Sequence, residues 1–328
     1  MKNLFKIKTT IILFFGLALM TSCTDTKDSS FTTGSSDNTI TGRAIVTPEL
    51  SILVSALKKC NLASTLQGTG PFTVFAPTND AFNVFLQSKG YANIDAVPTP
   101  MLTQILLNHV LNGAKNASKL VTKTYVKTLA IGSTSATNKL DMFILKIGAD
   151  DTIQLNGVAN VLQSDINASN GIIHIVGAVV ALPTLATHAV ANPLFNKLES
   201  IVTSPAQSAV LAVLTGNTAY TIFAPTDAAF IAFNTELTTT TNPAGLDGVS
   251  AANVTKVLQY HVITGNKLAI DLVAGTVTTA LTQTFSLALG PDATITDVNG
   301  RISNLTPANV QCSNGVLHIL DKVLLPTL

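Results

Sequence analysis

The sequence contains an internal repeat, and this feature restricts the fold more than any other. The block TVFAPTNDAF at 73–82 returns as TIFAPTDAAF at 221–230, with most positions identical. Two further blocks return in the same order: 106–113 as 258–265, and 170–175 as 314–319. Because three ordered blocks recur at a spacing of roughly 150 residues, one folding unit is written twice. Extra residues around 238–245 predict a longer loop in the second copy.

Length and composition agree with two globular domains. A chain of 328 residues exceeds the size at which a single hydrophobic core keeps growing. Apolar residues make up 47% of the chain and charged residues 11%, which is not the composition of a disordered protein. The net charge is +1 and no dense basic run is present, so nucleic acid is not an expected partner.

Each copy carries the signals of helices and short strands. Thr47-Pro48 and Asn192-Pro193 are typical of helix starts, because a capping residue precedes a proline that fits the first turn. The runs at 73–75 and 221–223 predict strands that end at Ala-Pro, since proline cannot donate to a sheet. A helix carrying the second block and several short strands, including the third block, complete each copy. The predicted fold class is α+β, twice over.

Residues of the repeated blocks are predicted to have structural roles. In the first copy these are Thr73, Phe75, Pro77, Asp80, His109 and His174, and in the second Phe223, Pro225, Asp227 and His318. Asp80 and Asp227 are expected on the first turn of a helix, where a carboxylate offsets unpaired amides. A catalytic acid at Asp80 is the alternative, and it is disfavoured because the second copy has Ala228 there.

The histidines raise the question of a metal site. Four of them, His109, His174, His261 and His318, occupy repeat-equivalent positions. The helical pair lies on apolar stripes and the other pair in apolar strands, and no second ligand stands at metal-binding spacing. Buried structural histidines are therefore predicted, with no metal and no cofactor. His188 has no supporting context.

Motifs of catalysis are missing from the sequence. It has no Gly-x-Ser-x-Gly elbow, no His-Glu-x-x-His and no phosphate-binding glycine loop. The chain is therefore predicted not to be an enzyme.

The first residues predict export. Lysines precede an apolar run at 11–20 that is too short to span a bilayer. The run ends in LMTSC, which resembles the lipobox of bacterial lipoproteins and implies cleavage before Cys23 and its acylation. Residues 1–22 are thus predicted as a lipoprotein signal peptide, and residues 23–43 as a flexible tether. The alternative is an ordinary signal peptide followed by a chance cysteine.

Cys60 and Cys312 fall in different copies and predict no disulfide.

The three blocks together resemble the fasciclin-type domain over roughly residues 44 to 328. The resemblance implies, in each copy, a wedge of short β-strands packed with several α-helices. It also implies a role in cell adhesion or extracellular matrix contacts. The expected domains are 44–183 and 192–328, joined by a short hinge at 184–191.

The resemblance also implies candidate partner-binding residues. Animal members use an Asp-Ile pair before the third block and hydrophobic or Tyr-His positions in the second. The first copy keeps Asp165-Ile166, where the second has Asn309-Val310. The second copy keeps Tyr260-His261, where the first has Asn108-His109. Asp165, Ile166, Tyr260 and His261 are therefore the candidates, although neither copy holds both pairs.

The function expected from these observations is a lipid-anchored adhesion or binding module of the bacterial cell envelope. It is expected at the outer membrane, with the surface and periplasmic faces both open. The expected partner is an extracellular or envelope protein, a matrix polymer or a glycan. Capture of a soluble glycan or other small ligand for uptake is the alternative, and an uncharacterised hydrolase is a third hypothesis.

Overall fold

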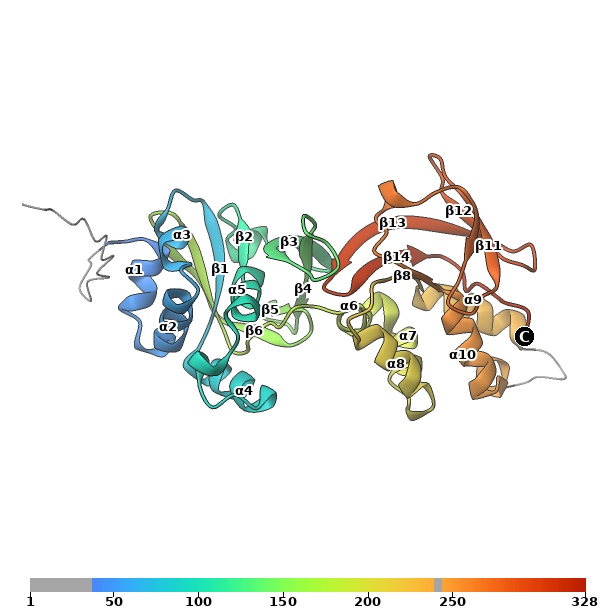
Figure 1. Ribbon diagram of the computed structural model, residues 1–328, viewed down its shortest axis with the longest axis horizontal. Coiled ribbons are helices and arrows are strands. Elements are labelled where there is room, and N and C mark those ends of the chain that lie inside the picture. Colours follow the sequence, from blue (N-terminus) through green and yellow to red (C-terminus); the bar gives the residue numbers. More distant parts are fainter. Residues whose placement is uncertain (1–36, 239–243) are drawn as a thin grey trace, which may run out of the picture. The chain divides into compact units, whose positions relative to one another are not determined.

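The computed structural model describes residues 37–238 and 244–328, which belong to one compact unit. The predicted signal peptide, Cys23 and most of the predicted tether lie outside the described residues. Figure 1 shows the order of the elements along the chain.

The helices and strands follow the same order in both copies, except that the second has an additional 3-10 helix, η5, between α7 and α8. The first copy contains α1 (Ile40–Ile45), η1 (Pro48–Leu50), α2 (Ser51–Lys59), α3 (Ala63–Gln67), β1 (Phe72–Pro77), α4 (Asn79–Lys89), η2 (Ile94–Ala96), α5 (Thr99–Asn108), β2 (Val110–Asn112), η3 (Ala117–Lys119), β3 (Thr124–Ile131), β4 (Lys139–Ile147), β5 (Thr152–Leu155), β6 (Ala159–Ala168) and β7 (Gly171–Val176). The second contains α6 (Leu185–Ala191), η4 (Pro193–Phe195), α7 (Asn196–Val202), η5 (Pro205–Gln207), α8 (Ser208–Thr215), β8 (Tyr220–Pro225), α9 (Asp227–Leu237), η6 (Gly245–Gly248), α10 (Ala251–Tyr260), β9 (Val262–Thr264), η7 (Ala269–Asp271), β10 (Gly275–Thr278), β11 (Thr284–Ala288), β12 (Thr294–Thr296), β13 (Ile302–Cys312) and β14 (Gly315–Leu320). The predicted α+β class is confirmed.

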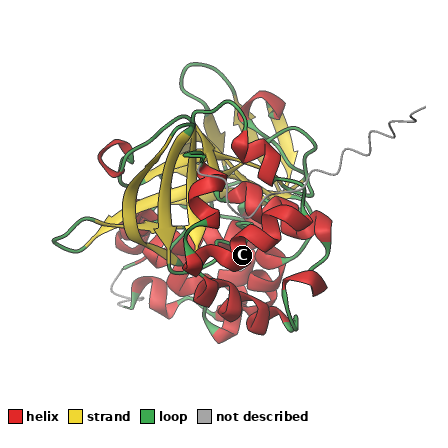
Figure 2. Ribbon diagram, turned by 90° about the vertical axis from the view of Figure 1, so that its left-hand side faces the viewer, coloured by secondary structure: helices red, strands yellow, loops and turns green. Residues whose placement is uncertain are grey.

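The sheets bring the first and third repeated blocks side by side. In the first copy β1 to β7 close into a barrel, and β1 runs parallel to β7 with Thr73 opposite Ile172. In the second copy the order is β10-β11-β12-β13-β14-β8-β9, and β8 runs parallel to β14. Figure 2 shows the strands curving on one side and helices gathered on the other. In the second domain, buried side chains of α7 and α8 form one cluster with those of β8 and β14, so these helices pack against the sheet.

The step from strand to helix at Ala-Pro forms as predicted. β1 and β8 end at Pro77 and Pro225. The hydroxyl of Thr78 then accepts a hydrogen bond from the amide of Ala81, and Thr226 does the same for Ala229, both at 3.2 Å. A threonine at this position satisfies one of the free amides of the first turn. The same local sequence therefore starts α4 and α9.

The second block differs from the prediction, which placed it on a helix. α5 ends at Asn108, and the chain continues from Val110 as β2. The imidazole of His109 lies 2.7 Å from the carbonyl of Ile105, and the carbonyl of His109 accepts from the amide of Phe75 on β1. Because β1 binds the backbone at this point, the block is half helix and half strand.

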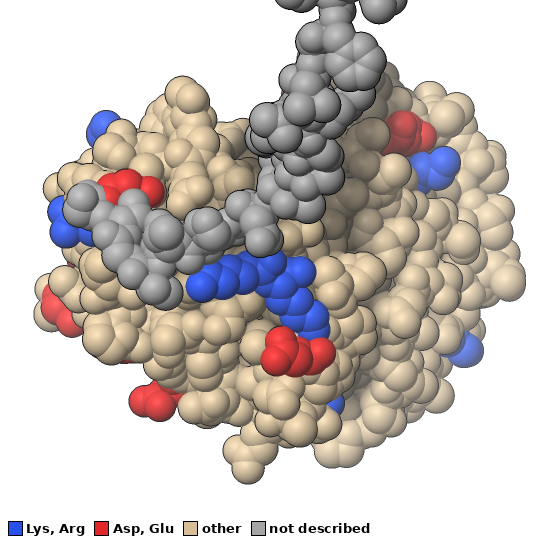
Figure 3. Space-filling model, turned by 60° about the vertical axis from the view of Figure 1, so that its left-hand side comes forward, with Lys and Arg blue, Asp and Glu red and all other residues tan. Residues whose placement is uncertain are grey.

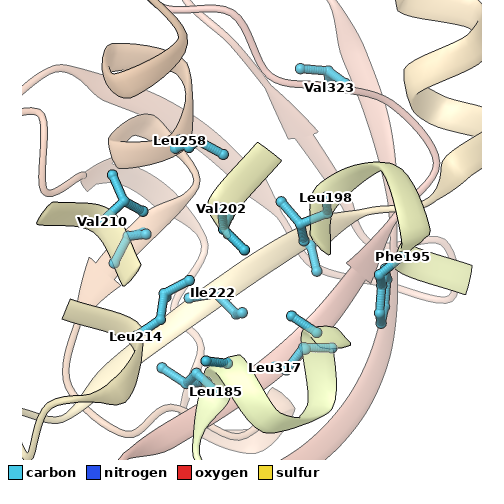
Figure 4. Packing of buried hydrophobic residues seen from close by; sticks show 14 of the residues in the cluster. Leu185, Phe195, Leu198, Val202, Val210, Leu214, Ile222, Leu258, Leu317 and Val323 are labelled. Atoms are coloured by element: carbon cyan, nitrogen blue, oxygen red, sulfur yellow. The ribbon is translucent and has the colours of Figure 1, made fainter. Parts of the chain in front are cut away.

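Buried side chains fill the space between the helices and the sheet. In the second domain this cluster includes Leu198, Val202, Leu214, Ile222 and Leu317, drawn in Figure 4. Burial of each large aliphatic side chain contributes roughly 1.5–3 kcal/mol to stability. The helices are thus held to the sheet mainly by apolar contacts.

The segment 184–191, predicted as a hinge, forms the buried helix α6. Leu185 is fully buried in the core of the second domain, and its amide donates to the side-chain oxygen of Asn314 at 2.9 Å. In the first domain the amide of Ile40 in α1 donates to Asn170 at the same distance. α6 is therefore the first helix of the second domain, and residues 40–43 of the predicted tether are its counterpart in the first. These contacts join residues far apart in the chain, so local sequence patterns at 40–43 and 184–191 do not indicate them.

Contacts also join the two copies. The carboxylate of Asp141 on β4 is 5% exposed, and it accepts hydrogen bonds from Lys127 at 2.6 Å and from the amide of Gln311 on β13 at 2.7 Å. Burial raises the pKa of Asp141, and Lys127 opposes this effect. The hydroxyl of Tyr125 accepts from the side chain of Asn192 at 3.0 Å. β4 and β13 are thus linked through buried polar groups.

Candidate partner-binding residues

Asp165 lies where strand β6 bulges away from β7. Its φ of 63° is in the left-handed region, and the register of the strand shifts between Gln163 and Ile166. The carboxylate accepts a hydrogen bond from the amide of Ala117 in η3 at 2.8 Å. The amide of Asp165 donates to Nδ1 of His174 at 3.2 Å. Asp165 therefore ties the bulge to two neighbouring elements, while Ile166 is half-buried opposite Ile173.

Asn309 repeats this arrangement in the second copy. Its φ is 48°, and its side-chain oxygen accepts from the amide of Ala269 in η7 at 2.6 Å. Aspartate and asparagine are the residues that best tolerate a left-handed backbone while offering a side-chain acceptor. The equivalent positions of the two copies hold Asp165 and Asn309, and this pairing of aspartate with asparagine was the sequence signal of a shared structural role.

The other candidate pair, Tyr260-His261, is buried. The hydroxyl of Tyr260 donates to the carbonyl of Thr284 at 2.7 Å, and its ring is fully buried. Nδ1 of His261 donates to the carbonyl of Val257 at 2.7 Å, and Nε2 accepts from the amide of Leu324 at 2.9 Å. In this conformation a partner has no access to either ring.

His109 makes the same two contacts in the first copy, with Ile105 and Val180. Burial lowers the pKa of both His109 and His261 to about 4, because the charged imidazolium would lose its hydration. Each neutral imidazole therefore links a helix to the last segment of its domain: His109 links α5 to Val180, and His261 links α10 to Leu324.

The histidines of the third block are also buried. His174 stacks on Phe75 with ring centroids 5.5 Å apart, and His318 stacks on Phe223 at 5.9 Å. Their Nε2 atoms lie 2.9 and 3.0 Å from the carbonyls of Lys115 and Lys267. Among the described residues no group of three His, Cys, Asp or Glu side chains could hold a metal ion. His188, in α6, is also fully buried.

The two predicted helix-start carboxylates have different surroundings. Asp80 is exposed on the first turn of α4. Asp227 accepts from the amide of Lys197 at 2.8 Å, which links α9 to α7. Asn79 makes the equivalent contact in the first copy, with the amide of Ile52 at 2.9 Å. The structural counterpart of Asp227 is therefore Asn79.

The family model for the fasciclin domain matches residues 48–183 and 195–326. The chain belongs to the fasciclin domain family. Protein sll1483 of Synechocystis is 32% identical over 133 residues, which cover 40% of this chain and 67% of that protein. Human periostin is 25% identical over 269 residues, covering 81% of this chain and 29% of periostin.

A solved structure supports the same fold. The FAS1 domain pair of the insect cell adhesion molecule fasciclin I shares 19% identity, with a TM-score of 0.52. The alignment covers 85% of this chain and 97% of that one. The tandem arrangement of fasciclin domains is thus confirmed. The chain spans less than a third of the length of periostin.

One face of this fasciclin pair carries few charges. On the face shown in Figure 3, charged side chains stand among a mostly uncharged surface. No helix in the described part of the chain is both long and apolar enough to cross a bilayer.

Cys60 is half-buried and Cys312 buried, and both are free thiols.

The sequence analysis did not identify one hollow of the second fasciclin domain. It lies between α7, α9 and η6 and has a volume of about 550 Å³. Its lining includes Asn196, Lys197, Asp227, Asn234 and Asp247. The extra residues around 238–245, noted in the sequence, were the signal that this region differs between the copies.

Substitution at Asp165 separates a structural role from a charge-dependent binding role. Asp165→Asn keeps the acceptor and the left-handed backbone, so we expect a change in unfolding free energy below about 0.5 kcal/mol. Asp165→Leu loses the hydrogen bond and strains the backbone, with an expected loss of about 2–3 kcal/mol. Urea denaturation measures both, and Asn309→Asp is the matched control. A large loss for Asp165→Asn would contradict the structural role.

Proposed function

We propose that this fasciclin pair is a non-enzymatic adhesion module of the bacterial cell envelope, held to the membrane by a lipid on Cys23. The observation that carries the proposal is the burial of the histidines within two complete fasciclin domains. Their ring atoms are shielded from solvent, and four of the five have hydrogen bonds to the backbone. The domains therefore present surfaces for contact instead of reactive groups.

The proposed partner is an extracellular or envelope protein, a matrix polymer or a glycan. The matched structure, named as an insect cell adhesion molecule, supports this kind of role. Asp165 and Ile166 stay candidates for contact, because both are half-buried at the bulge of β6. Tyr260 and His261 would act indirectly, by holding the end of the second domain in place.

A second function is favoured by the hollow between α7 and α9. A cavity of about 550 Å³ is of the size that takes small ligands. Capture of a soluble glycan or other small ligand for uptake would use such a cavity.

Deletion of residues 44–328, with the anchor retained, tests the adhesion module. We expect attachment of the cells to a surface or biofilm cohesion to fall, because the contact surfaces are gone. A Cys23→Ser variant serves as a second arm: the chain should leave the membrane fraction, and attachment should fall to a similar level. Unchanged attachment in the deletion strain would count against the proposal.

A further inference from the structure

Among the described residues, the second domain lacks a set of hydrogen bonds that closes the region of the first domain corresponding to the hollow between α7, α9 and η6. In the first domain Nζ of Lys59, on α2, donates to the carbonyls of Ile94, Asp95 and Val97 at 3.1, 2.7 and 2.5 Å. This pulls η2 against α2, where Ile94 and Val97 are buried. The lysine thus closes the corresponding region of the first domain.

In the second domain the contact between α7 and η6 is weaker. Nζ of Lys197 lies 3.8 Å from the carboxylate of Asp247, and these side chains are 42% and 86% exposed. An exposed ion pair of this kind contributes between zero and about 1 kcal/mol. η6 is held instead to α9, because Asn234 accepts from the amide of Leu246 at 2.7 Å. The described residues therefore leave a hollow between α7 and η6.

Hydrogen bonds to the backbone position two of the polar side chains in the hollow, Asp227 and Asn234. Asp227, which lines the hollow, accepts from the amide of Lys197 through Oδ1 at 2.8 Å. Asn234 uses its oxygen for Leu246, and its Nδ2 makes no hydrogen bond to the described residues. The side chain of Asn196 is exposed and has no such bond either within the described part of the chain. The lining thus offers both donors and acceptors to a ligand.

An apolar surface lies beside these groups. Ile231 on α9 is 68% exposed, and Phe230 is buried beneath the same lining. Hydroxyl groups need paired donors and acceptors, whereas the C–H face of a sugar ring packs on apolar surface. The two carboxylates of Asp227 and Asp247 outnumber the one ammonium group of Lys197, so the lining repels anions. These properties together fit an uncharged polyhydroxylated ligand.

We propose that this hollow of the second fasciclin domain is a binding site for a neutral oligosaccharide. The inference rests on the proposed contact function and names glycan as the partner of this site. The volume of about 550 Å³ accommodates a short stretch of sugar units, so an internal segment or an end of a chain can bind.

The test is isothermal titration of the chain with neutral and acidic oligosaccharides. The probes are cellohexaose, laminarihexaose, mannohexaose and xylohexaose, with oligogalacturonate as the acidic member. We expect saturable binding of at least one neutral probe and none of oligogalacturonate. Ser200→Trp fills the hollow and should weaken binding at least tenfold. Ser55→Trp, at the exposed equivalent position of the first domain, should leave the Kd within twofold.

Asn196→Ala is a second variant that does not depend on the tryptophan being tolerated. It removes an exposed amide and should weaken binding at least threefold. Absence of binding for all neutral probes, preference for oligogalacturonate, or an unchanged Kd in both hollow variants would overturn the proposal. The attachment assay is scored separately. If the deletion strain loses attachment but the binding experiments give any of these results, the proposed adhesion function is kept and the oligosaccharide site is rejected.

Discussion

Replacing Gly171 with valine is expected to unfold the first fasciclin domain while the second keeps its structure. Gly171 begins β7 with a φ of 155°, which side-chain-bearing residues rarely adopt. A Cβ atom there would overlap the carbonyl oxygen of Phe72 on the parallel strand β1. The atoms that the Cβ would meet are backbone atoms of Phe72, which cannot move aside as a flexible side chain could, so we expect a loss of more than about 4 kcal/mol in the free energy of unfolding.

Hydrogen exchange by mass spectrometry locates the effect. Peptides of β1, α5 and β7 should lose protection, and those of β8, α10 and β14 should keep most of theirs. Gly315→Val is the mirror experiment, since a Cβ at Gly315 would overlap the carbonyl oxygen of Tyr220. Gly290→Ala is the control, because that glycine is exposed and has open space around the Cβ position. Normal protection of β7 in Gly171→Val would refute the parallel pairing.

Acidification from pH 7 to pH 4 is expected to destabilise both domains through their buried histidines. Burial lowers the folded pKa of His109 and His261 to about 4, below the unfolded value of 6.5. Between these values the unfolded chain binds more protons than the folded one. The contribution of the neutral histidines to the free energy of unfolding is therefore fully present above about pH 6.5 and is lost as the pH falls toward 4. The lost stability is on the order of 3 kcal/mol for each of the two residues.

His188 acts in the same direction, because burial lowers its pKa to about 3. Asp141 acts in the opposite direction, since burial raises its pKa and protonation relieves the cost of the buried charge. The net effect is expected to follow the histidines, because several of them contribute.

Urea denaturation at a series of pH values measures this dependence. His109→Gln should lower the stability of the first domain at pH 7 and make its pH dependence shallower below pH 6.5. His261→Gln should do the same for the second domain, and each variant serves as the control for the other. Equal stability at pH 7 and pH 4.5 in the unsubstituted chain would contradict the assignment of neutral, buried histidines.

Features encoded by neighbouring residues could be predicted from the sequence. The step from β1 to α4 follows from Pro77, which ends the strand, and Thr78, which caps the next helix. The third block predicts a strand because it is a short, mostly apolar run that follows Asn-Gly. Repetition strengthened each of these predictions, since the same pattern appears again at Pro225 and Thr226.

Features that depend on distant contacts could not be predicted in this way. Asn170 binds the carbonyls of Leu66 and Gly68 as well as the amide of Ile40, and these partners lie far apart in the chain. Without them, the polar residues before Ile40 and the short segment before Asn192 suggest a tether and a hinge. The burial of Tyr260 similarly depends on Thr284 and Phe285, which β11 brings to its ring.

The sequence by itself determined that one α+β domain occurs twice, because short-range patterns of caps, prolines and apolar runs are local and were repeated. Only the tertiary structure decided which of the candidate side chains are buried and where a hollow remains. Burial and cavities depend on packing between elements far apart in the chain, as when Lys59 closes η2 against α2 in one copy while η6 stays apart from α7 in the other.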